Sequence, residues 1–303
     1  MSSISSSPSF ARLLIVLGFL GQVALGAIGD VFNVQPGTTE GGCDDHTAAL
    51  DRWFEDSQTL IKAAAVGVAA TDTDSLGYLN GFFSIKPAGS KKEVTRRVTR
   101  VQEVLDNTKV PPGGKPYLFC DSDWVIEQAW DALALDVATG KPFPTNDKIE
   151  DIYGPTDKQK RELSPFWNAK IGYVFSAPGD YCSNPENMGA TQDGTKPSTV
   201  TLCIKNFKAD QGVTLADIPA VTAAGLSIHD LQAHSLTLFH EMFHLTLGLA
   251  TTPDHSYKLS DILKFGIRDG TQNPESYAMY ALAYHLGQTY TGFTFADGSS
   301  VTK

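Results

Sequence analysis

Residues 239–257, FHEMFHLTLGLATTPDHSY, contain two histidines and a glutamate in the pattern H-E-x-x-H. On a helix, a spacing of four residues places His240 and His244 on one face, so both imidazoles can bind the same metal ion. Glu241 then lies beside the open coordination position. Zinc with three protein ligands lowers the pKa of its bound water towards ~7, and a neighbouring carboxylate can take the proton as that water attacks a carbonyl. These residue types predict metal-assisted hydrolysis of a peptide bond.

The surroundings of the motif favour a functional helix over a chance pattern. With seven histidines in the chain, a random H-E-x-x-H is expected roughly once in a hundred such sequences. Apolar side chains surround the motif on nearly every side of the predicted helix, which is typical of a helix that runs through the centre of a domain. They are Leu236, Leu238, Phe239, Phe243, Leu245, Leu247 and Leu249. Burying two histidines and a glutamate there without partners would be costly, and a bound metal would satisfy all three.

The sequence offers few candidates for a third ligand. The pattern HExxHxxGxxH is excluded because positions 247 and 250 are Leu and Ala. A thermolysin-like glutamate is also not supported, since the only glutamate after Glu241 is Glu275, far beyond His244. The remaining carboxylate is Asp254, ten residues after His244 and just past a predicted helix end at Gly248. The adjacent His255 competes with it, although neighbouring side chains usually point apart.

The segment TTPDHSY resembles a motif of the aspzincins, the deuterolysin and peptidyl-lysine metalloendopeptidase family. Thr252, Asp254 and Tyr257 match the T-x-D-x-x-Y core of its G-T-x-D-x-x-Y-G motif, whereas Thr251 and Lys258 stand where the family has glycines. Two further segments resemble the family's downstream N-x-x-S-Y helix and its cysteine-containing strand. They are NPESYAMYA at 273–281 and TVTLCIKNF at 199–207.

This resemblance implies a role for each matched residue. His240, His244 and Asp254 would bind one zinc ion. Glu241 would be the general base, and Tyr257 would donate a hydrogen bond to the tetrahedral oxyanion. The implied protein is a secreted zinc-dependent endopeptidase acting on polypeptides. The alternative is a non-catalytic secreted binding or effector protein on a zincin scaffold.

Other polar residues near the motif have simpler predicted roles. His234 lies on another side of the helix and His285 lies in an apolar helix, so neither is expected to bind metal. Asp261 and Asp269 are candidates for orienting the ligand imidazoles. Asn273, Glu275 and Ser276 open the last predicted helix, where N-terminal capping is their simplest role. The family resemblance implies the alternative that this segment borders the substrate cleft, where a carboxylate facing the pocket would favour lysine or arginine in the substrate.

The elements that must position these residues follow from hydrophobic periodicity and turn signals. Helices are predicted at 44–69, 91–106, 231–249, 256–265 and 274–287, and strands at 117–120, 170–176 and 198–207. No repeat or long linker interrupts them. We therefore predict one α+β domain over residues 27–303. It would be zincin-like and mainly helical, with a small antiparallel-containing sheet and an active-site H-E-x-x-H helix.

The N-terminus and the cysteines indicate secretion. Residues 1–26 combine one positive charge, a short apolar run and small residues near a cleavage site, which is typical of a signal peptide. Four cysteines then predict two disulfides among three possible pairings. Our hypothesis is that Cys182 pairs with Cys203 across the loop of a hairpin, residues 178–198, and that Cys43 pairs with Cys120.

The charge of the chain limits its partners. The formal net charge is −10, with 34 acidic and 24 basic residues. Nucleic acid and anionic membranes both require a concentrated basic face, so neither is expected as a partner. The prediction is a monomer that acts on polypeptide substrates.

Overall fold

The computed structural model describes residues 27–37 and 41–303. The predicted signal peptide, residues 1–26, lies outside the described residues. The α-helices are α1 (Ile28–Val31), α2 (Thr47–Ala69), α3 (Thr73–Phe83), α4 (Lys92–Leu105), α5 (Ile149–Tyr153), α6 (Asp157–Glu162), α7 (Ser235–Leu247), α8 (Leu259–Ile262), α9 (Ile267–Gln272) and α10 (Pro274–Thr289). The strands are β1 (Asn33–Val34), β2 (Tyr117–Phe119), β3 (Ile126–Glu127), β4 (Ser164–Asn168), β5 (Gly172–Ser176), β6 (Gly189–Gln192), β7 (Thr199–Leu202), β8 (Phe293–Thr294) and β9 (Val301–Thr302).

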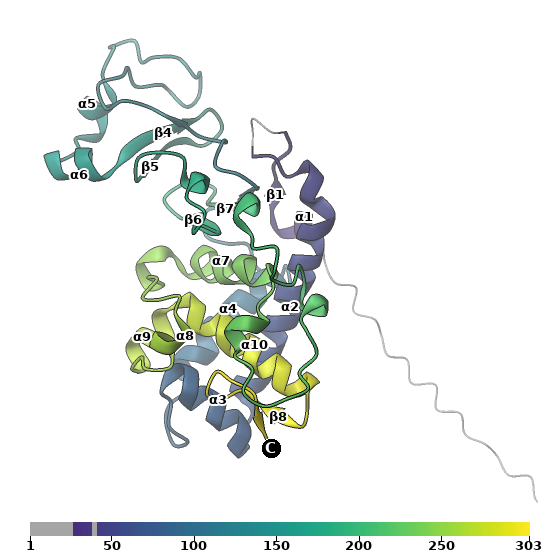
Figure 1. Cartoon of the computed structure of the whole chain (residues 1–303). Coiled ribbons are helices and arrows are strands. Elements are labelled where there is room, and N and C mark those ends of the chain that lie inside the picture. Colours follow the sequence, from purple (N-terminus) through teal and green to yellow (C-terminus); the bar gives the residue numbers. More distant parts are fainter. Residues whose placement is uncertain (1–26, 38–40) are drawn as a thin grey trace, which may run out of the picture.

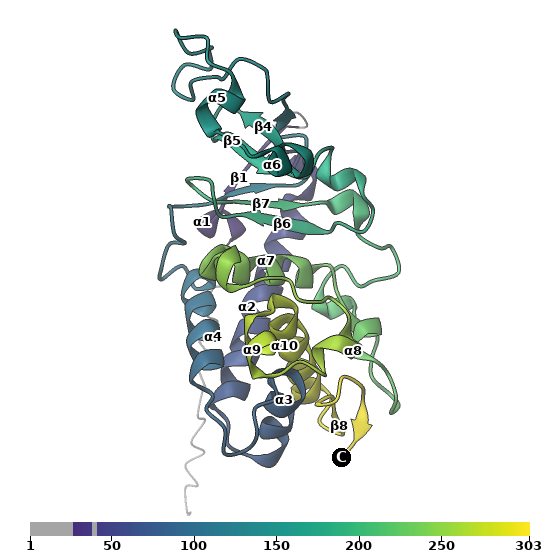
Figure 2. The same ribbon diagram turned by 90° about the vertical axis from the view of Figure 1, so that its left-hand side faces the viewer.

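The helices α2, α4 and α10 pack together beneath α7 and form the main hydrophobic core (Figure 2). The helices α2 and α4 each present an apolar stripe at the spacing that the sequence predicts, whereas α10 is buried on nearly every side. On α2 the buried side chains include Leu50, Trp53, Phe54, Leu60, Ile61 and Ala64, and on α4 they include Val94, Val98, Val101 and Leu105. Because these stripes recur every three or four residues, the two helices meet along their length.

A four-stranded sheet covers the opposite side of α7 (Figures 1 and 2). Its strand order is β1-β2-β7-β6, so β6 is an outer strand. The strands β1, β2 and β7 run parallel, and β6 pairs antiparallel with β7. All four residues of β7 are buried, as expected for a strand covered on both faces. The helix α7 is thus enclosed between a sheet and a helical layer.

A second sheet lies beyond the first, on the side away from α7 (Figure 1). It is antiparallel, in the order β3-β4-β5, and α5 and α6 lie near it. Its buried side chains Phe166 and Val174 pack with Trp124 and Phe119 in a small separate core. The fold is therefore a mixture of helices and small sheets, in agreement with the α+β prediction at that level.

Most predicted elements are confirmed, and two predictions are wrong in detail. The elements that were not predicted are α1, α3, α5, α6, α9, β1, β3, β4, β6, β8 and β9. The helix α3 was not predicted, because Gly77 and Gly81 weaken its helical signal. The segment predicted as a helix at 256–265 is helical only over Leu259–Ile262. The predicted hairpin around residues 178–198 is wrong, because β5 pairs with β4 and not with β7. The partner of β7 is β6, which begins inside the segment that the sequence marks as a loop.

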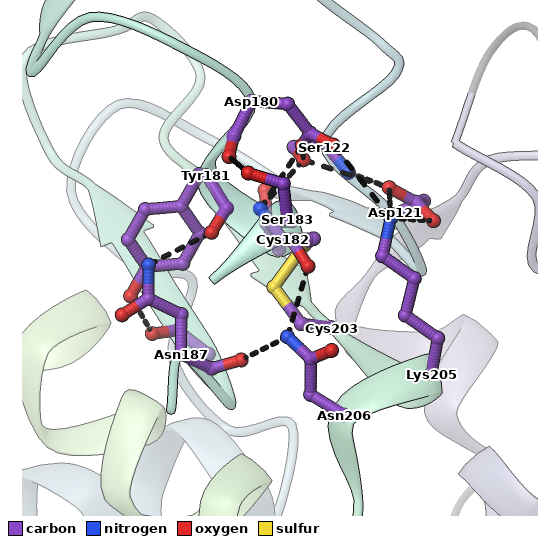
Figure 3. The surroundings of a disulfide bond; sticks show 12 residues. Asp121, Ser122, Asp180, Tyr181, Cys182, Ser183, Asn187, Cys203, Lys205 and Asn206 are labelled. Atoms are coloured by element: carbon purple, nitrogen blue, oxygen red, sulfur yellow. Dashed lines mark hydrogen bonds and ion pairs between the residues drawn. A yellow bond between two sulfur atoms is a disulfide. The ribbon is translucent and has the colours of Figure 1, made fainter. Parts of the chain in front are cut away.

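Both hypothesised disulfides are present. Cys43 pairs with Cys120, 77 residues away, and joins the start of α2 to the end of β2. Cys182 pairs with Cys203 and ties the segment before β6 to the end of β7 (Figure 3). Asn206 reinforces the second link by donating to the backbone carbonyls of Cys182 and Asn187, at 3.0 and 2.8 Å.

Replacing Cys43 and Cys120 together by alanine should lower the free energy of unfolding by about 2–4 kcal/mol. The cross-link closes a long loop, so its removal frees many conformations of the unfolded chain. Urea unfolding followed by circular dichroism measures the change. A variant with unchanged unfolding midpoint would show that this disulfide does not stabilise the fold.

In the part of the chain that the structure describes, no helix combines the length and apolarity needed to cross a membrane.

Candidate metal centre

The helix α7 carries the H-E-x-x-H motif through the interior. Its residues are buried almost all round, as the sequence predicts. His240 and His244 are 4% and 2% exposed, and their rings lie 5.0 Å apart. Gly248 ends the helix with a positive φ of 83°, and a short turn over Leu249–Thr251 leads the chain back over the motif. The four-residue spacing therefore places both imidazoles on the same buried face of α7, as predicted.

Asp254 completes a group of three donor atoms. Its Oδ1 lies 3.1 Å from His240 Nε2 and 3.1 Å from His244 Nε2, and the two nitrogens are also 3.1 Å apart. Ligands at 2.0–2.1 Å from a tetrahedral zinc ion are separated by about 3.3 Å. The triangle of donors thus has the size that a single metal ion requires, and His240, His244 and Asp254 could hold one.

Hydrogen bonds orient both imidazoles towards this point. His240 Nδ1 lies 2.8 Å from Glu275 Oε2, and the carboxylate can only accept. His244 Nδ1 lies 3.0 Å from Thr252 Oγ1, whose own proton goes to the carbonyl of Gly248 at 2.8 Å. Both Nδ1 atoms are therefore the donors, so both Nε2 atoms face Asp254. Once deprotonated, these two nitrogens and the carboxylate present three lone pairs to one cation.

Without a metal, the carboxylates and imidazoles at the centre stabilise one another's charges. Burial alone would lower the pKa of His240, but its bonds to Asp254 and Glu275 raise that pKa to about 10. Burial alone would raise the pKa of Asp254, but His240 and His244 hold it well below its usual range. The carboxylates thus stabilise a positive charge at the point where the two imidazoles meet.

Glu241 is buried beside the three donors. Thr191 of β6 donates its hydroxyl to Glu241 Oε2 at 2.7 Å and so fixes the carboxylate. Burial raises the pKa of Glu241, and the nearby His240 and His244 oppose that effect. A Cβ atom at Gly189 would lie 2.9 Å from Glu241 Oε1, so any larger residue there would displace this carboxylate. The carboxylate is held in place with a raised proton affinity, as a general base requires.

Tyr257 lies over the centre. Its ring stacks on His240, with 5.5 Å between centroids and an interplanar angle of 22°, and 59% of the residue is exposed. Burial of the hydroxyl and the negative charge of Asp254 raise the pKa of Tyr257, which keeps the phenol protonated as a donor. It lines an open cleft of about 270 Å³ together with His240 and Glu241. The phenol and the carboxylate therefore border the same space.

The loop that carries Asp254 and Tyr257 is tied to two helices. Asn273, which is fully buried, accepts from the backbone N–H of His255 and donates to the carbonyl of Ser256, at 3.0 and 3.1 Å. Arg97 of α4, also buried, donates to the carbonyl of Thr251 at 3.0 Å. Thr251 and Lys258 stand where the motif has glycines. Neither is among the residues with a positive φ, so neither position requires a glycine.

The other candidates lie away from the donor triangle. The ring of His255 packs on Phe265, with centroids 6.0 Å apart, and His234 Nε2 lies 2.8 Å from the carbonyl of Lys208. His285 is half-buried in α10. Asp261 accepts from Ser256, not from an imidazole. The backbone carbonyl of Asp269 accepts from the N–H of Asn273 at 3.0 Å.

Sequence reasoning missed the positioning residues. It favoured capping for Glu275, but the Asn273 side chain makes no capping bond and Glu275 accepts from His240. Glu275 also lines the cleft, in agreement with the alternative that this segment borders it. It also gave no role to Thr191 or Arg97. The one sequence signal for Glu275 is a carboxylate in the first turn of an otherwise apolar helix. The sequence does not show that this helix packs against α7.

A second group of acidic side chains lies near the Cys182–Cys203 disulfide. Asp121, Asp123 and Asp180 bring carboxylate oxygens within 4.8 Å of one another. Lys205 pairs with Asp121 at 3.3 Å and with Asp180 at 3.7 Å (Figure 3). The lysine already balances part of this negative charge.

Comparison of the chain with protein-family models, with curated proteins and with solved structures found no match.

Replacing Glu275 by glutamine should weaken metal binding by about 10- to 100-fold, because the acceptor to His240 loses its charge. Isothermal titration with zinc measures the affinity. Glu186→Gln is the matched control, because Glu186 borders the same cleft without contacting the donors. Equal affinities of the wild type and Glu275→Gln would contradict the positioning role.

Proposed function

We propose that this protein is a secreted zinc-dependent endopeptidase of the aspzincin type, with a zincin-like fold. The observation that carries the proposal is the convergence of His240 Nε2, His244 Nε2 and Asp254 Oδ1 beside the buried carboxylate of Glu241. The position of Asp254 agrees with the motif T-x-D-x-x-Y, on which the family resemblance rests. The two disulfides fit an extracellular protein.

The residues of this centre suit metal-assisted hydrolysis. A zinc ion held by His240, His244 and Asp254 would supply an acidified water and polarise the carbonyl of the substrate. Glu241 takes the proton from the attacking water, and its raised pKa lets it carry that proton to the leaving amine. The phenol of Tyr257 donates a hydrogen bond to the developing oxyanion. Glu275 and Thr252 keep the two imidazoles in place.

The surroundings of the cleft suit a polypeptide. The outer strand β6 borders it, since the first residue of this strand, Gly189, lines the cleft beside Glu241 of α7. An extended peptide can add to the free edge of such a strand through backbone hydrogen bonds. The scissile carbonyl would then lie near Glu241 and Tyr257. Nucleic acid is a poorer fit to this protein, because the chain carries an excess of acidic residues.

Digestion of a peptide library with mass-spectrometric readout tests the proposal. The protein loaded with one zinc ion should cleave internal peptide bonds, lose this activity with a chelator and regain it when zinc is restored. A protein that binds stoichiometric zinc and cleaves no peptide would instead be the non-catalytic binding protein on a zincin scaffold.

A further inference from the structure

A second cavity lies on the face of the four-stranded sheet opposite to α7. Its volume is about 250 Å³. Ala190 and Gln192 of β6 and Thr201 of β7 line it, whereas the alternate residues Gly189 and Thr191 approach Glu241 on the other face. Ala190 and Thr201 are direct partners across the two strands, so they share that face. The cavity is therefore separate from the metal centre but built on the same strands.

The floor of the cavity is apolar and well supported. Trp124, Phe166 and Val174 line it, and all three are more than 90% buried. Trp124 stacks on Phe119, with centroids 4.3 Å apart, and donates from Nε1 to Thr201 at 2.9 Å. Because these contacts fix the indole, the floor exists before any ligand arrives. The volume of the cavity is below the ~300–1,000 Å³ of pockets that bind whole small molecules. A cavity of this size with an apolar floor suits one long side chain.

Carboxylates gather among the lining residues. They belong to Asp123, Glu127 and Asp180, and in the described part of the chain no lysine, arginine or histidine lines the cavity. Asp180 is held by the hydroxyl of Ser122 and by the backbone N–H of Cys182 (Figure 3). Glu127 accepts from the backbone N–H of Gly179 at 3.2 Å. Asp123 and Glu127 are exposed, so the negative charge is available to a ligand.

Tyr181 connects this cavity with the catalytic cleft. It lines both spaces and donates its hydroxyl to the carbonyl of Gly189 at 2.6 Å. A peptide lying along the free edge of β6 would direct alternate side chains to opposite faces of the sheet. One side chain would face the metal centre, and a neighbour in the sequence would reach the cavity.

We propose that this cavity binds an arginine side chain of the polypeptide substrate, an inference that rests on the proposed endopeptidase function. The methylene stem of arginine fits the apolar floor, and its planar guanidinium stacks on aromatic rings. Its five N–H donors can reach several carboxylates at once, whereas the ammonium of lysine is a compact point charge. Asp123 and Glu127 supply the negative charge at the mouth.

The test measures binding and cleavage separately. Labelled decapeptides carry arginine, lysine or the uncharged arginine analogue citrulline at one fixed position and are randomised elsewhere. Fluorescence anisotropy gives their affinities for zinc-loaded Glu241→Gln protein, which does not require turnover. Cleavage of the same peptides is measured with the wild type. The double substitution Asp123→Asn/Glu127→Gln is made in both backgrounds. Its matched control is Asp157→Asn/Glu162→Gln, which removes two exposed charges from α6, neither of which lines the cavity.

The arginine peptides should bind about five- to tenfold more tightly than the citrulline peptides. The ratio should fall to about one in Asp123→Asn/Glu127→Gln and persist in the control. The arginine site would be overturned if cleavage showed no preference for arginine, if lysine peptides bound as tightly as arginine peptides, or if the double variant kept the arginine-to-citrulline ratio.

Selective arginine binding without cleavage by the wild type would retain the site and refute the endopeptidase. If selective binding and cleavage were both absent, both proposals would be refuted.

Discussion

Substitution of Glu241 by glutamine should lower kcat/KM for peptide cleavage by about 10²- to 10⁴-fold. Glutamine keeps the shape of the side chain but cannot take a proton from water. Glu241 is not one of the three donors, so the variant should still bind one metal ion per chain. The fold should also persist, because the amide can still accept from the Thr191 hydroxyl that now contacts Glu241 at 2.7 Å.

The comparison requires kinetics and metal analysis on the same samples. Cleavage of a quenched fluorescent peptide gives kcat/KM, and mass spectrometry of the digested protein gives the zinc content. Glu162→Gln is the control, since this exposed carboxylate of α6 pairs with Lys158 and is not among the residues that line the cleft. If Glu241→Gln retained full activity with one bound zinc, the role of Glu241 as general base would have to be abandoned.

Among these substitutions, removal of the carboxylate of Asp254 should cause the largest loss of zinc affinity. Asp254→Ala should lower zinc affinity by more than about 100-fold, because it deletes a charged ligand, whereas changes to the partners of ligands cost 10–100-fold. The neighbouring substitution His255→Ala should leave the affinity unchanged. The ring of His255 packs on Phe265, with centroids 6.0 Å apart, while Asp254 Oδ1 lies 3.1 Å from both ligand nitrogens.

Competition with a fluorescent zinc chelator measures both affinities on one scale. Circular dichroism of the two variants checks that each is folded. The opposite order, with His255→Ala losing zinc and Asp254→Ala keeping it, would assign the third ligand to His255.

The sequence predicts the local part of the candidate centre because helix geometry fixes it. A spacing of four residues is enough to bring His240 and His244 together, and the end of the helix at Gly248 returns the chain within ten residues to Asp254. The apolar stripes of α2 and α4 were predictable for the same reason. The family resemblance and the catalytic role of these residues stay predictions.

Contacts between distant segments could not be predicted from the sequence. Glu275 is 35 residues from His240, and Thr191 is 50 residues from Glu241. Their contacts depend on how α10 and β6 pack around α7, which hydrophobic periodicity does not specify. The strand β6 itself, GATQ, has no strong apolar alternation. For that reason β7 was assigned the wrong hairpin partner, and the cavity behind β6 was not foreseen.

The most direct test of the central claim is X-ray diffraction from zinc-loaded crystals, measured on both sides of the zinc absorption edge. Anomalous difference density should show one ion within about 2.0–2.2 Å of His240 Nε2, His244 Nε2 and Asp254 Oδ1. An ion bound at Asp121, Asp123 and Asp180 instead, with no density between the two histidines, would contradict the metal centre and the hydrolytic function built on it.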